Sequence, residues 1–366
     1  MDVLRARFDA TSASVPRDLT VTNTTIKEKN KMSIVIPKNY KANMDVHETQ
    51  IAIKEVKDVF ERALAGELNL TRVSAPLFVR KESGLNDNLN GVERPVAFGI
   101  KEQNDKEVEI VQSLAKWKRF ALKDYGFSTG EGLYADMCAI RRDEDTDNLH
   151  SIYVDQWDWE AIIDKSERNT ETLKDKVRHV YAALRKTEKK LHEKYDFLTN
   201  ELPEDITFIS SEELLSLYPD KTPKEREYIY AKEHGAIFIS QIGGVLSNGE
   251  RHDGRAPDYD DWKLNGDIIV YYPVLDCALE LSSMGIRVDE LSLEEQLKIC
   301  GCEERAGLPF QRSLLWGELP YTVGGGIGQS RICMYFLEKA HIGEVQSSIW
   351  LDEDIKAAEE NNIFLL

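Results

Sequence analysis

Four short segments of this sequence hold charged and polar residues at spacings that could serve a reaction. The first is segment 113–124, SLAKWKRFALKD, where helical spacing from Leu114 places Lys118 on the apolar stripe with Trp117 and Leu122. A lysine there commonly extends its ammonium to water along its aliphatic stem. The alternative is a cation directed into a cleft that holds a carboxylate or a phosphate. The spacing leaves both interpretations open.

The second segment is HSIYVDQWDWE, residues 150–160, which predicts a strand with two different faces. Side chains alternate along a strand, so the polar groups of Gln156, Asp158 and Glu160 share one face, opposite the rings of Trp157 and Trp159. This pattern is typical of a strand whose polar half lines a pocket. A solvent-facing edge of an antiparallel sheet would show the same alternation.

The third segment, RHDGRAPDYDDW, is a proline-containing loop with Arg255, Asp258, Asp260 and Asp261. Clustered carboxylates can exchange protons, bind a metal ion or hold an ammonium group. In so acidic a protein, a solvated acidic loop is the commoner explanation.

The fourth segment is GGGIGQSR, residues 324–331, which we expect to open the last helix. It lacks the Lys-Ser/Thr pair of a phosphate loop, and Gln329 stands where the third glycine of the dinucleotide fingerprint belongs. Such glycines would let a nucleotide ring approach the backbone closely, and Arg331 would stack on a base or pair with phosphate. A plain turn is the alternative.

The elements that must position these segments follow from hydrophobic periodicity. An amphipathic helix is predicted from about residue 46, with Gly66 as its stop. Its apolar stripe consists of Ile53, Val56, Phe60 and Leu64. The longest helix is predicted near 166–195.

Further helices are expected from Ser113, around 212–217 and 224–234, and from Gln329. Asn248-Gly249 predicts a hairpin turn. Strands follow one another more than they alternate with helices, so we predict an α+β fold with an antiparallel β-sheet flanked by helices. The expected strands are 68–76, 108–111, 206–210, 236–240, 267–274 and 279–288.

Composition restricts the class of protein. The 366 residues are 42% hydrophobic and 31% charged, which is globular, and 65 acidic against 47 basic residues give a net charge of −18. So negative a surface disfavours nucleic-acid partners. No apolar run approaches the roughly 18 residues of a membrane span, and five scattered cysteines predict reduced thiols in a cytoplasmic protein rather than disulfides or a zinc site at Cys300 and Cys302.

In chain order, these segments resemble the three motifs of class II aminoacyl-tRNA synthetases, the aspartate and asparagine type most of all. They resemble more closely an offshoot of that superfamily, the ammonia-dependent aspartate–ammonia ligases (asparagine synthetase A). Eight blocks carry this resemblance between about residues 40 and 350. They read NDNLNGVE, SLAKWKR, YGFSTGEGLY, YVDQWDWE, RHDGRAPDYDDW, LNGDI, ELSSMGIRVD and GGGIGQSR.

The resemblance implies an ATP-dependent ligase that makes L-asparagine from L-aspartate and ammonia. ATP with Mg²⁺ would convert the β-carboxylate of aspartate to β-aspartyl-AMP and pyrophosphate, and ammonia would then displace AMP. It also implies a class II catalytic domain over residues 33–366, after a flexible extension over 1–32, and a homodimer built on the first motif. Nucleic acid and membranes are not expected as partners.

The resemblance also implies roles for individual residues. Arg141 would bridge the α-phosphate and the carboxylate, although Arg142 stands where the family usually has proline, so both arginines are candidates and Arg141 is preferred. Asp267 and Glu280 would bind Mg²⁺. The nucleotide would contact Arg141, Asp267, Ile268, Glu280, Ser282, Gly326 and Arg331. Aspartate would contact Asp87, Ser113, Lys118, Gln156, Asp158, Asp260, Ser283 and Arg287.

Arg141, Lys118, Asp260 and Gln156 would act in catalysis, and Asp260 or Asp158 would attract ammonium and remove its proton. Two rival functions remain. A compact synthetase charging a tRNA would need a basic groove and an anticodon-binding domain, which neither the charge nor the roughly 45 N-terminal residues supply. A regulatory module would be expected to have lost some of Lys118, Arg141, Glu280 and Arg331, yet all four are present. The sequence leaves open whether glutamine can supply the nitrogen.

Overall fold

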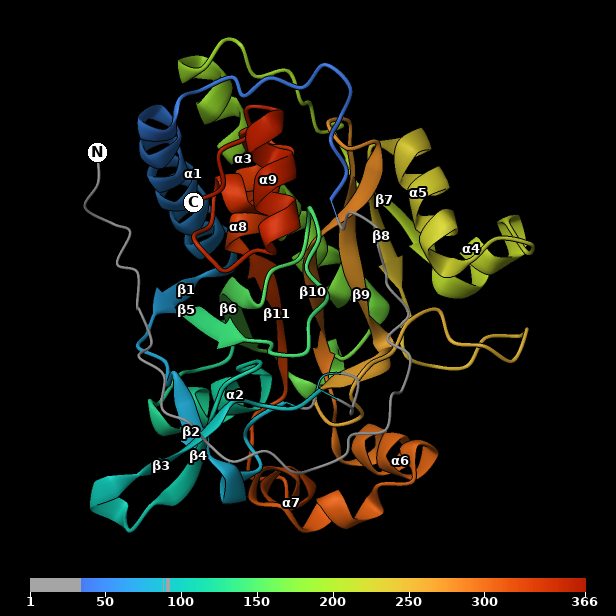
Figure 1. The fold of residues 1–366 in the computed structure, drawn as a ribbon. Helices are drawn as coiled ribbons and strands as arrows, with labels where there is room; N and C mark the ends of the chain where they lie inside the picture. Colours follow the sequence, from blue (N-terminus) through green and yellow to red (C-terminus); the bar gives the residue numbers. More distant parts are fainter. Residues whose placement is uncertain (1–33, 88, 90–92) are drawn as a thin grey trace, which may run out of the picture. The chain divides into compact units, whose positions relative to one another are not determined.

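A computed structural model describes residues 34–87, 89 and 93–366 of the chain, and its central element is an eight-stranded sheet (Figure 1). The two outer pairs, β1–β5 and β7–β8, are parallel, and the five pairings between them are antiparallel. The predicted antiparallel α+β fold is thus confirmed. In spatial order the strands are β1 (Leu70–Arg72), β5 (Gly132–Ile140), β6 (Tyr153–Ile162), β11 (Thr322–Gly328), β10 (Cys277–Arg287), β9 (Asp260–Tyr272), β8 (Ala236–Ser240) and β7 (Thr207–Ser210).

One face of this sheet carries the main hydrophobic core. The helices α1 (Val46–Leu68), α3 (Thr170–Lys194) and α8 (Gln329–Phe336) supply its outer half. Trp157 and Trp159 of β6 point into it, and the Phe60 ring of α1 lies 4.8 Å from the Trp157 ring. The tryptophan face of β6 is therefore buried as predicted, and its polar face turns to the other side of the sheet.

The remaining elements border the sheet. The helix α2 (Ala115–Asp124) contacts β5, β6 and β11, and α4 (Ser211–Leu217) and α5 (Pro223–His234) pack by β7, β8 and β9. Figure 1 shows α6 (Glu290–Cys300) and α7 (Pro309–Leu315) at one end and α9 (Asp352–Glu360) near α8. A small sheet is formed by β2 (Phe78–Arg80), β4 (Lys106–Ile110) and β3 (Ala97–Ile100).

The first helix begins where the sequence predicts and ends later. Asp45 and Glu48 form a capping box at its start, and Val56, Phe60 and Leu64 are buried. Gly66 does not stop the helix, which continues to Leu68 and closes on Asn69 with a φ of 54°. Asparagine tolerates this left-handed conformation, so the cap falls three residues beyond the glycine.

The glycines of segment 324–331 form a strand in the middle of the sheet rather than a turn, and the segment opens the helix α8 at Gln329 as predicted. Gly324, Gly325 and Gly326 belong to β11 and pair with β6 on one side and β10 on the other. A side chain at Gly324 would overlap the Glu160 carboxylate, and a Cβ at Gly326 would lie 2.6 Å from Gln156 Oε1. The glycines thus make room for polar side chains of the neighbouring strand.

One smaller expectation also needs correction. The Asn248-Gly249 turn closes a single bridge between Val245 and Arg251 rather than a hairpin of strands. The strand β5 was not predicted, and residues 1–32, expected to form a flexible extension, lie outside the described residues. Within the described part of the chain, every helix is too short or too polar to cross a membrane.

Candidate active site

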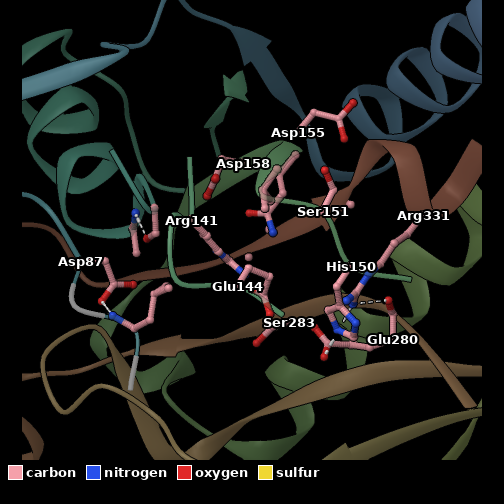
Figure 2. A pocket seen from close by; sticks show the side chains of 18 of the residues that line it. Asp87, Arg141, Glu144, His150, Ser151, Asp155, Asp158, Glu280, Ser283 and Arg331 are labelled. Carbon is pink, nitrogen blue, oxygen red and sulfur yellow. Dashed lines mark hydrogen bonds and ion pairs between the residues drawn. The ribbon is translucent and has the colours of Figure 1, made fainter. Parts of the chain in front are cut away.

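A cavity of about 460 Å³ opens on the polar face of the sheet and gathers most of the predicted site residues (Figure 2). The register of the strands brings these residues together. Asp158 pairs with Gly326, Gly326 with Ser283, and Ser283 with Asp267 across four adjacent strands. The predicted residues that line the cavity are Asp87, Ser113, Arg141, Gln156, Asp158, Asp260, Glu280, Ser283, Arg287, Gly326 and Arg331.

Four predicted residues do not line the cavity. Ile268 belongs to the main hydrophobic core, so its side chain points away from any ligand. Ser282 is buried, and its hydroxyl has no hydrogen-bond partner among the described residues. Lys118 and Asp267 lie directly behind the wall, where each holds a residue that does line it.

Lys118 is fully buried, so the expectation that its ammonium reaches water is wrong. Its Nζ donates to Asp158 Oδ1 at 2.5 Å and to the backbone oxygens of Trp159 and Gly325 at 3.0 and 3.2 Å. This leaves Asp158 Oδ2 buried without a partner within the described part of the chain. Lys118 therefore fixes the Asp158 carboxylate from behind and leaves one oxygen for a ligand.

A second buried ion network braces the same end of the cavity. Arg287 donates to both oxygens of Glu160 at 2.8–3.0 Å and to Asp260 Oδ1 at 2.5 Å. Burial raises the pKa of the Asp260 carboxyl, and Arg287 counteracts part of that effect. Burial also opposes ionisation of Glu160, but Arg287 and Lys118 outweigh it and lower the pKa of Glu160. We call Asp158, Asp260, Arg287 and Gln156 the carboxylate end of the cavity.

The aspartates at the start of β9 and just before it are buried, which contradicts the expectation of a solvated acidic loop. Asp258 and Asp260 are 1% and 2% exposed, and Asp261 is 6% exposed. Lys116 contacts Asp258 at 3.3 Å, Arg168 contacts Asp261 at 2.9 Å, and Asp260 shares Arg287 with Glu160. The loop is an internal wall because these pairs offset the cost of burying its charges.

The opposite end of the cavity is rich in cations, and we call it the guanidinium end. Arg141, Arg255, Arg331 and Lys224 line it together with Glu280. Figure 2 shows Arg141, Arg331 and Glu280 of this group. Arg331 Nη1 donates to the Glu280 backbone oxygen at 3.0 Å and lies 4.0 Å from Glu280 Oε2. Burial opposes ionisation of Glu280, but these four cations together lower its pKa. These cations are partly paired with carboxylates, because Lys224 contacts Glu227 at 3.0 Å and Arg255 contacts both Asp253, at 3.3 Å, and Asp267.

Arg141 lines this end of the cavity, whereas Arg142 is exposed and is not part of its wall. The Nε of Arg141 is buried and lacks a hydrogen-bond partner within the described residues. A planar guanidinium with unused donors can take a phosphate or carboxylate oxygen. The geometry therefore favours Arg141 as the second-motif arginine.

Asp267 and Glu280 offer the oxygens that a hard cation requires. Asp267 Oδ2 forms an ion pair with Arg255, and its Oδ1 is buried without a partner in the described part of the chain. Burial, reinforced by the charge of Glu280, raises the pKa of Asp267 to about 6 in spite of Arg255. Two neighbouring carboxylates with a free oxygen fit Mg²⁺, which takes one or two carboxylates and fills its other positions with water and phosphate.

Comparison with known proteins decides the family. Residues 47–362 match the family model described as aspartate-ammonia ligase. An aspartate–ammonia ligase of Clostridium perfringens is 64% identical over 333 residues, covering 91% of this chain and 99% of the relative. The chain belongs to the aspartate–ammonia ligase family. The chain is thus an enzyme, and a ligase of Ruminiclostridium cellulolyticum, 64% identical over 334 residues, covers the same shares of both chains.

Solved structures place the fold of this aspartate–ammonia ligase family member among class II synthetases. The asparaginyl-tRNA synthetase of Pyrococcus horikoshii in complex with asparaginyl-adenylate superimposes with a TM-score of 0.60 at 14% identity, over 82% of this chain and 68% of that one. The asparaginyl-tRNA synthetase of Entamoeba histolytica superimposes with a TM-score of 0.57, over 82% of this chain and 66% of that one. At these identities the likeness concerns the fold.

The sequence of this ligase-family chain gave no role to several charged or polar cavity residues, among them Arg255, Lys224 and His150. Arg255 and Lys224 line the guanidinium end, and His150 lines the wall with its Nδ1 2.9 Å from Asp147 Oδ1. Arg255 lies in a segment that the sequence singled out, so its neighbouring aspartates were an available signal. His150 opens the second segment that the sequence singled out and lies in the loop before β6. Lys224 lies in a helix whose local pattern resembles ordinary surface, and only the tertiary structure brings it to the cavity.

Proposed function

We propose that this enzyme makes L-asparagine from L-aspartate and ammonia through β-aspartyl-AMP, with release of AMP and pyrophosphate. The observation that carries the proposal is the division of the cavity into a carboxylate end and a guanidinium end. An amino acid with an α-ammonium group complements the first end, and a triphosphate complements the second. The reacting carboxylate and α-phosphate would then meet between the ends, beside Arg141 and Ser283.

The carboxylate end would bind aspartate. The α-ammonium would take the free oxygen of Asp158, next to Gln156 and Asp260. Asp87, Ser113 and Ser283 would border the rest of the amino acid. Lys118 and Arg287 would contribute by holding Asp158 and Asp260 in place, which pre-orders the site before the substrate arrives.

The guanidinium end would bind ATP. Arg141 would span the α-phosphate and the β-carboxylate of aspartate and so offset the repulsion between two anions. Arg331 would cover the adenine or the distal phosphates, and Gly326 would let the nucleotide approach the strand closely. Asp267 and Glu280 would hold Mg²⁺, which when bound neutralises phosphate charge.

We also propose that the enzyme is a cytoplasmic homodimer. The five cysteines, which lie between Cys138 and Cys333, are free thiols, as expected in a reducing compartment. The helix α1 exposes Val46 and Ile51, which a partner subunit could cover, as the resemblance of this helix to the first motif implies. Light scattering of the purified protein tests the dimer, and a monomeric mass would contradict it.

The test of the reaction is a product analysis. The protein is incubated with aspartate, ATP, Mg²⁺ and an ammonium salt, and nucleotides and amino acids are quantified over time. We expect AMP, pyrophosphate and asparagine in equal amounts. Formation of ADP and phosphate, or of AMP without asparagine, would contradict the proposal.

A further inference from the structure

Asp87, which lines the cavity, belongs to a buried group of polar residues, and the proposed reaction gives no role to the other members of this group. We call it the acceptor cluster, and it consists of Asp87, Gln112, Lys116, Asp258 and Gln311. Its members come from four parts of the chain, namely the segment around Asp87, the start of α2, the loop before β9 and α7. Each is at most 5% exposed, so the cluster is an internal feature and not a solvated surface.

The cluster is held together by a few defined hydrogen bonds. Asp258 Oδ2 accepts from Gln311 Nε2 at 2.6 Å and from Lys116 Nζ at 3.3 Å. Gln112 Nε2 donates to the backbone oxygen of Asp87 at 2.8 Å. The charges of Lys116 and Asp258 are close enough to act on the pKa of the Asp87 carboxyl, which burial raises. The five residues therefore form one electrostatic unit.

Four oxygen atoms of this unit are buried and lack a hydrogen-bond partner among the described residues. They are Asp87 Oδ2, Gln112 Oε1, Asp258 Oδ1 and Gln311 Oε1. The two amides cannot be turned to relieve this, because their nitrogens already face acceptors, a carboxylate and a carbonyl. Leaving a buried acceptor unpaired is costly, so the cluster is built for something that donates hydrogen bonds.

The charge count restricts what that donor can be. Two carboxylates face one ammonium, so the cluster carries one surplus negative charge. Arg141 acts on Asp87 from the cavity side, but in the proposed reaction its guanidinium is engaged by phosphate. Water would satisfy acceptors without neutralising this charge. A small cation with several N–H donors satisfies both requirements.

We propose that the acceptor cluster is the ammonium subsite of this enzyme, with Asp258 and Gln311 as its principal ligands. This inference rests on the proposed function and assigns the nitrogen substrate a place separate from aspartate. Asp87 belongs to the cluster and also lines the cavity, so it connects the two. The alternatives Asp158 and Asp260 belong to the carboxylate end, where the proposed function already places the α-ammonium group of aspartate.

The chemistry balances with the groups present. Ammonium gives one proton to the Asp87 carboxylate and becomes ammonia, whose lone pair forms the C–N bond to the activated carbonyl carbon. The C–O bond to the phosphate breaks, and AMP leaves with its electron pair. The nitrogen then releases a second proton to the solvent, and asparagine remains.

The test varies the nucleophile. Gln311→Met keeps the side-chain volume and removes the acceptor, and Asp258→Asn removes the charge, so either variant tests the subsite if the other fails to fold. Arg312→Met is the matched control on the same helix, since Arg312 stacks on the Trp316 ring, 5.3 Å away. Each protein is assayed for aspartate-dependent pyrophosphate exchange without ammonium, for the KM of ammonium, and for hydroxylamine as a neutral replacement nucleophile.

We expect Gln311→Met and Asp258→Asn to raise the KM of ammonium about tenfold or more while exchange and the hydroxylamine reaction stay within about threefold of the parent enzyme. Arg312→Met should change none of the three. An unchanged KM of ammonium in a folded variant would contradict the proposed subsite and would indicate that water molecules satisfy the acceptors of the cluster. An equal loss with ammonium and hydroxylamine would overturn it as well, since that is the result of a structural role. If the parent enzyme itself fails to exchange pyrophosphate, the proposed function fails instead.

Discussion

The two ends of the cavity differ in how their charged side chains are paired. At the carboxylate end, Lys118 holds Asp158 and Arg287 holds Glu160 and Asp260, so most charges are already paired inside the protein. At the guanidinium end, Lys224 and Arg255 are paired with Glu227, Asp253 and Asp267, whereas Arg141 and Arg331 lie beside Glu280 with donors directed to the cavity (Figure 2). Among the described residues, the first end leaves one carboxylate oxygen, Asp158 Oδ2, without a partner, and the second leaves Arg141 Nε without one.

This difference predicts different consequences of mutation at the two ends. Removing one partner of a buried ion pair leaves an uncompensated charge and destabilises the fold. Removing a cation whose partner is the substrate affects binding and rate but leaves the fold nearly unchanged. Matched substitutions at the two ends therefore test whether the comparison is right.

The largest effect is expected for Arg287→Met. It leaves Glu160 and Asp260 buried without their cation, so the free energy of unfolding should fall by about 3–5 kcal/mol. The matched variant at the other end, Arg331→Met, should lose less than about 1 kcal/mol, because Arg331 is partly exposed to the cavity. Urea unfolding measures both, and equal losses of stability would contradict the distinction.

The variant Arg141→Ala tests the guanidinium end by its effect on activity rather than on stability. The guanidinium is proposed to stabilise charge that develops between phosphate and carboxylate, so aspartate-dependent pyrophosphate exchange should fall by about 10²–10³-fold with little change in stability. Arg142→Ala is the control and should stay within about twofold of the parent, because Arg142 is exposed. Near-normal exchange in Arg141→Ala would transfer the role to Arg142.

A smaller loss is expected for Lys118→Met, which removes the cation behind Asp158 and keeps the length of the side chain. We expect kcat/KM for aspartate to fall about 10–100-fold, with a smaller change in the KM of ATP, because the displaced carboxylate belongs to the carboxylate end. Steady-state kinetics with each substrate varied separates the two. A variant that loses affinity for ATP as much as for aspartate would show that the ends are not independent.

The smallest effect is expected for His341, which lies outside both ends of the cavity and changes the pH dependence of the free energy of unfolding. Burial lowers the pKa of His341 to about 4, below the value of about 6.5 that it has when unfolded. The unfolded chain therefore binds a proton between these values while the folded protein does not, so stability falls as the pH drops from about 6.5 toward 4. Between pH 7.5 and 5, His341→Gln should lose about 2 kcal/mol less than the parent in urea unfolding. Parallel pH profiles would show that His341 does not titrate in this way.

Much of the fold and site follows from local patterns, and the rest depends on contacts between distant segments. Periodicity located α1, α3 and the two faces of β6, because each pattern is set by which residues meet the core. Spacing alone could not show that Gly324–Gly326 form a central strand, since the need for glycine there comes from Glu160 and Gln156 on the neighbouring strand.

The local sequence pattern did not predict which charged side chains are buried. Asp258, Asp260 and Lys118 look like surface residues by composition, and their burial depends on partners 27 to 142 positions away in the chain. The family resemblance named Asp260 and Lys118 as site residues and not Asp258, and of the three only Asp260 lines the cavity. It could not distinguish side chains that line the wall from those that support it.

The central claim is that aspartate is activated by adenylation before ammonia reacts. Its most direct test is the exchange of labelled pyrophosphate into ATP by the parent enzyme, with aspartate and Mg²⁺ present and ammonium absent. The account predicts exchange that requires aspartate and proceeds without ammonium. Exchange that appears only when ammonium is added, or none at all from an enzyme that still makes asparagine, would contradict it.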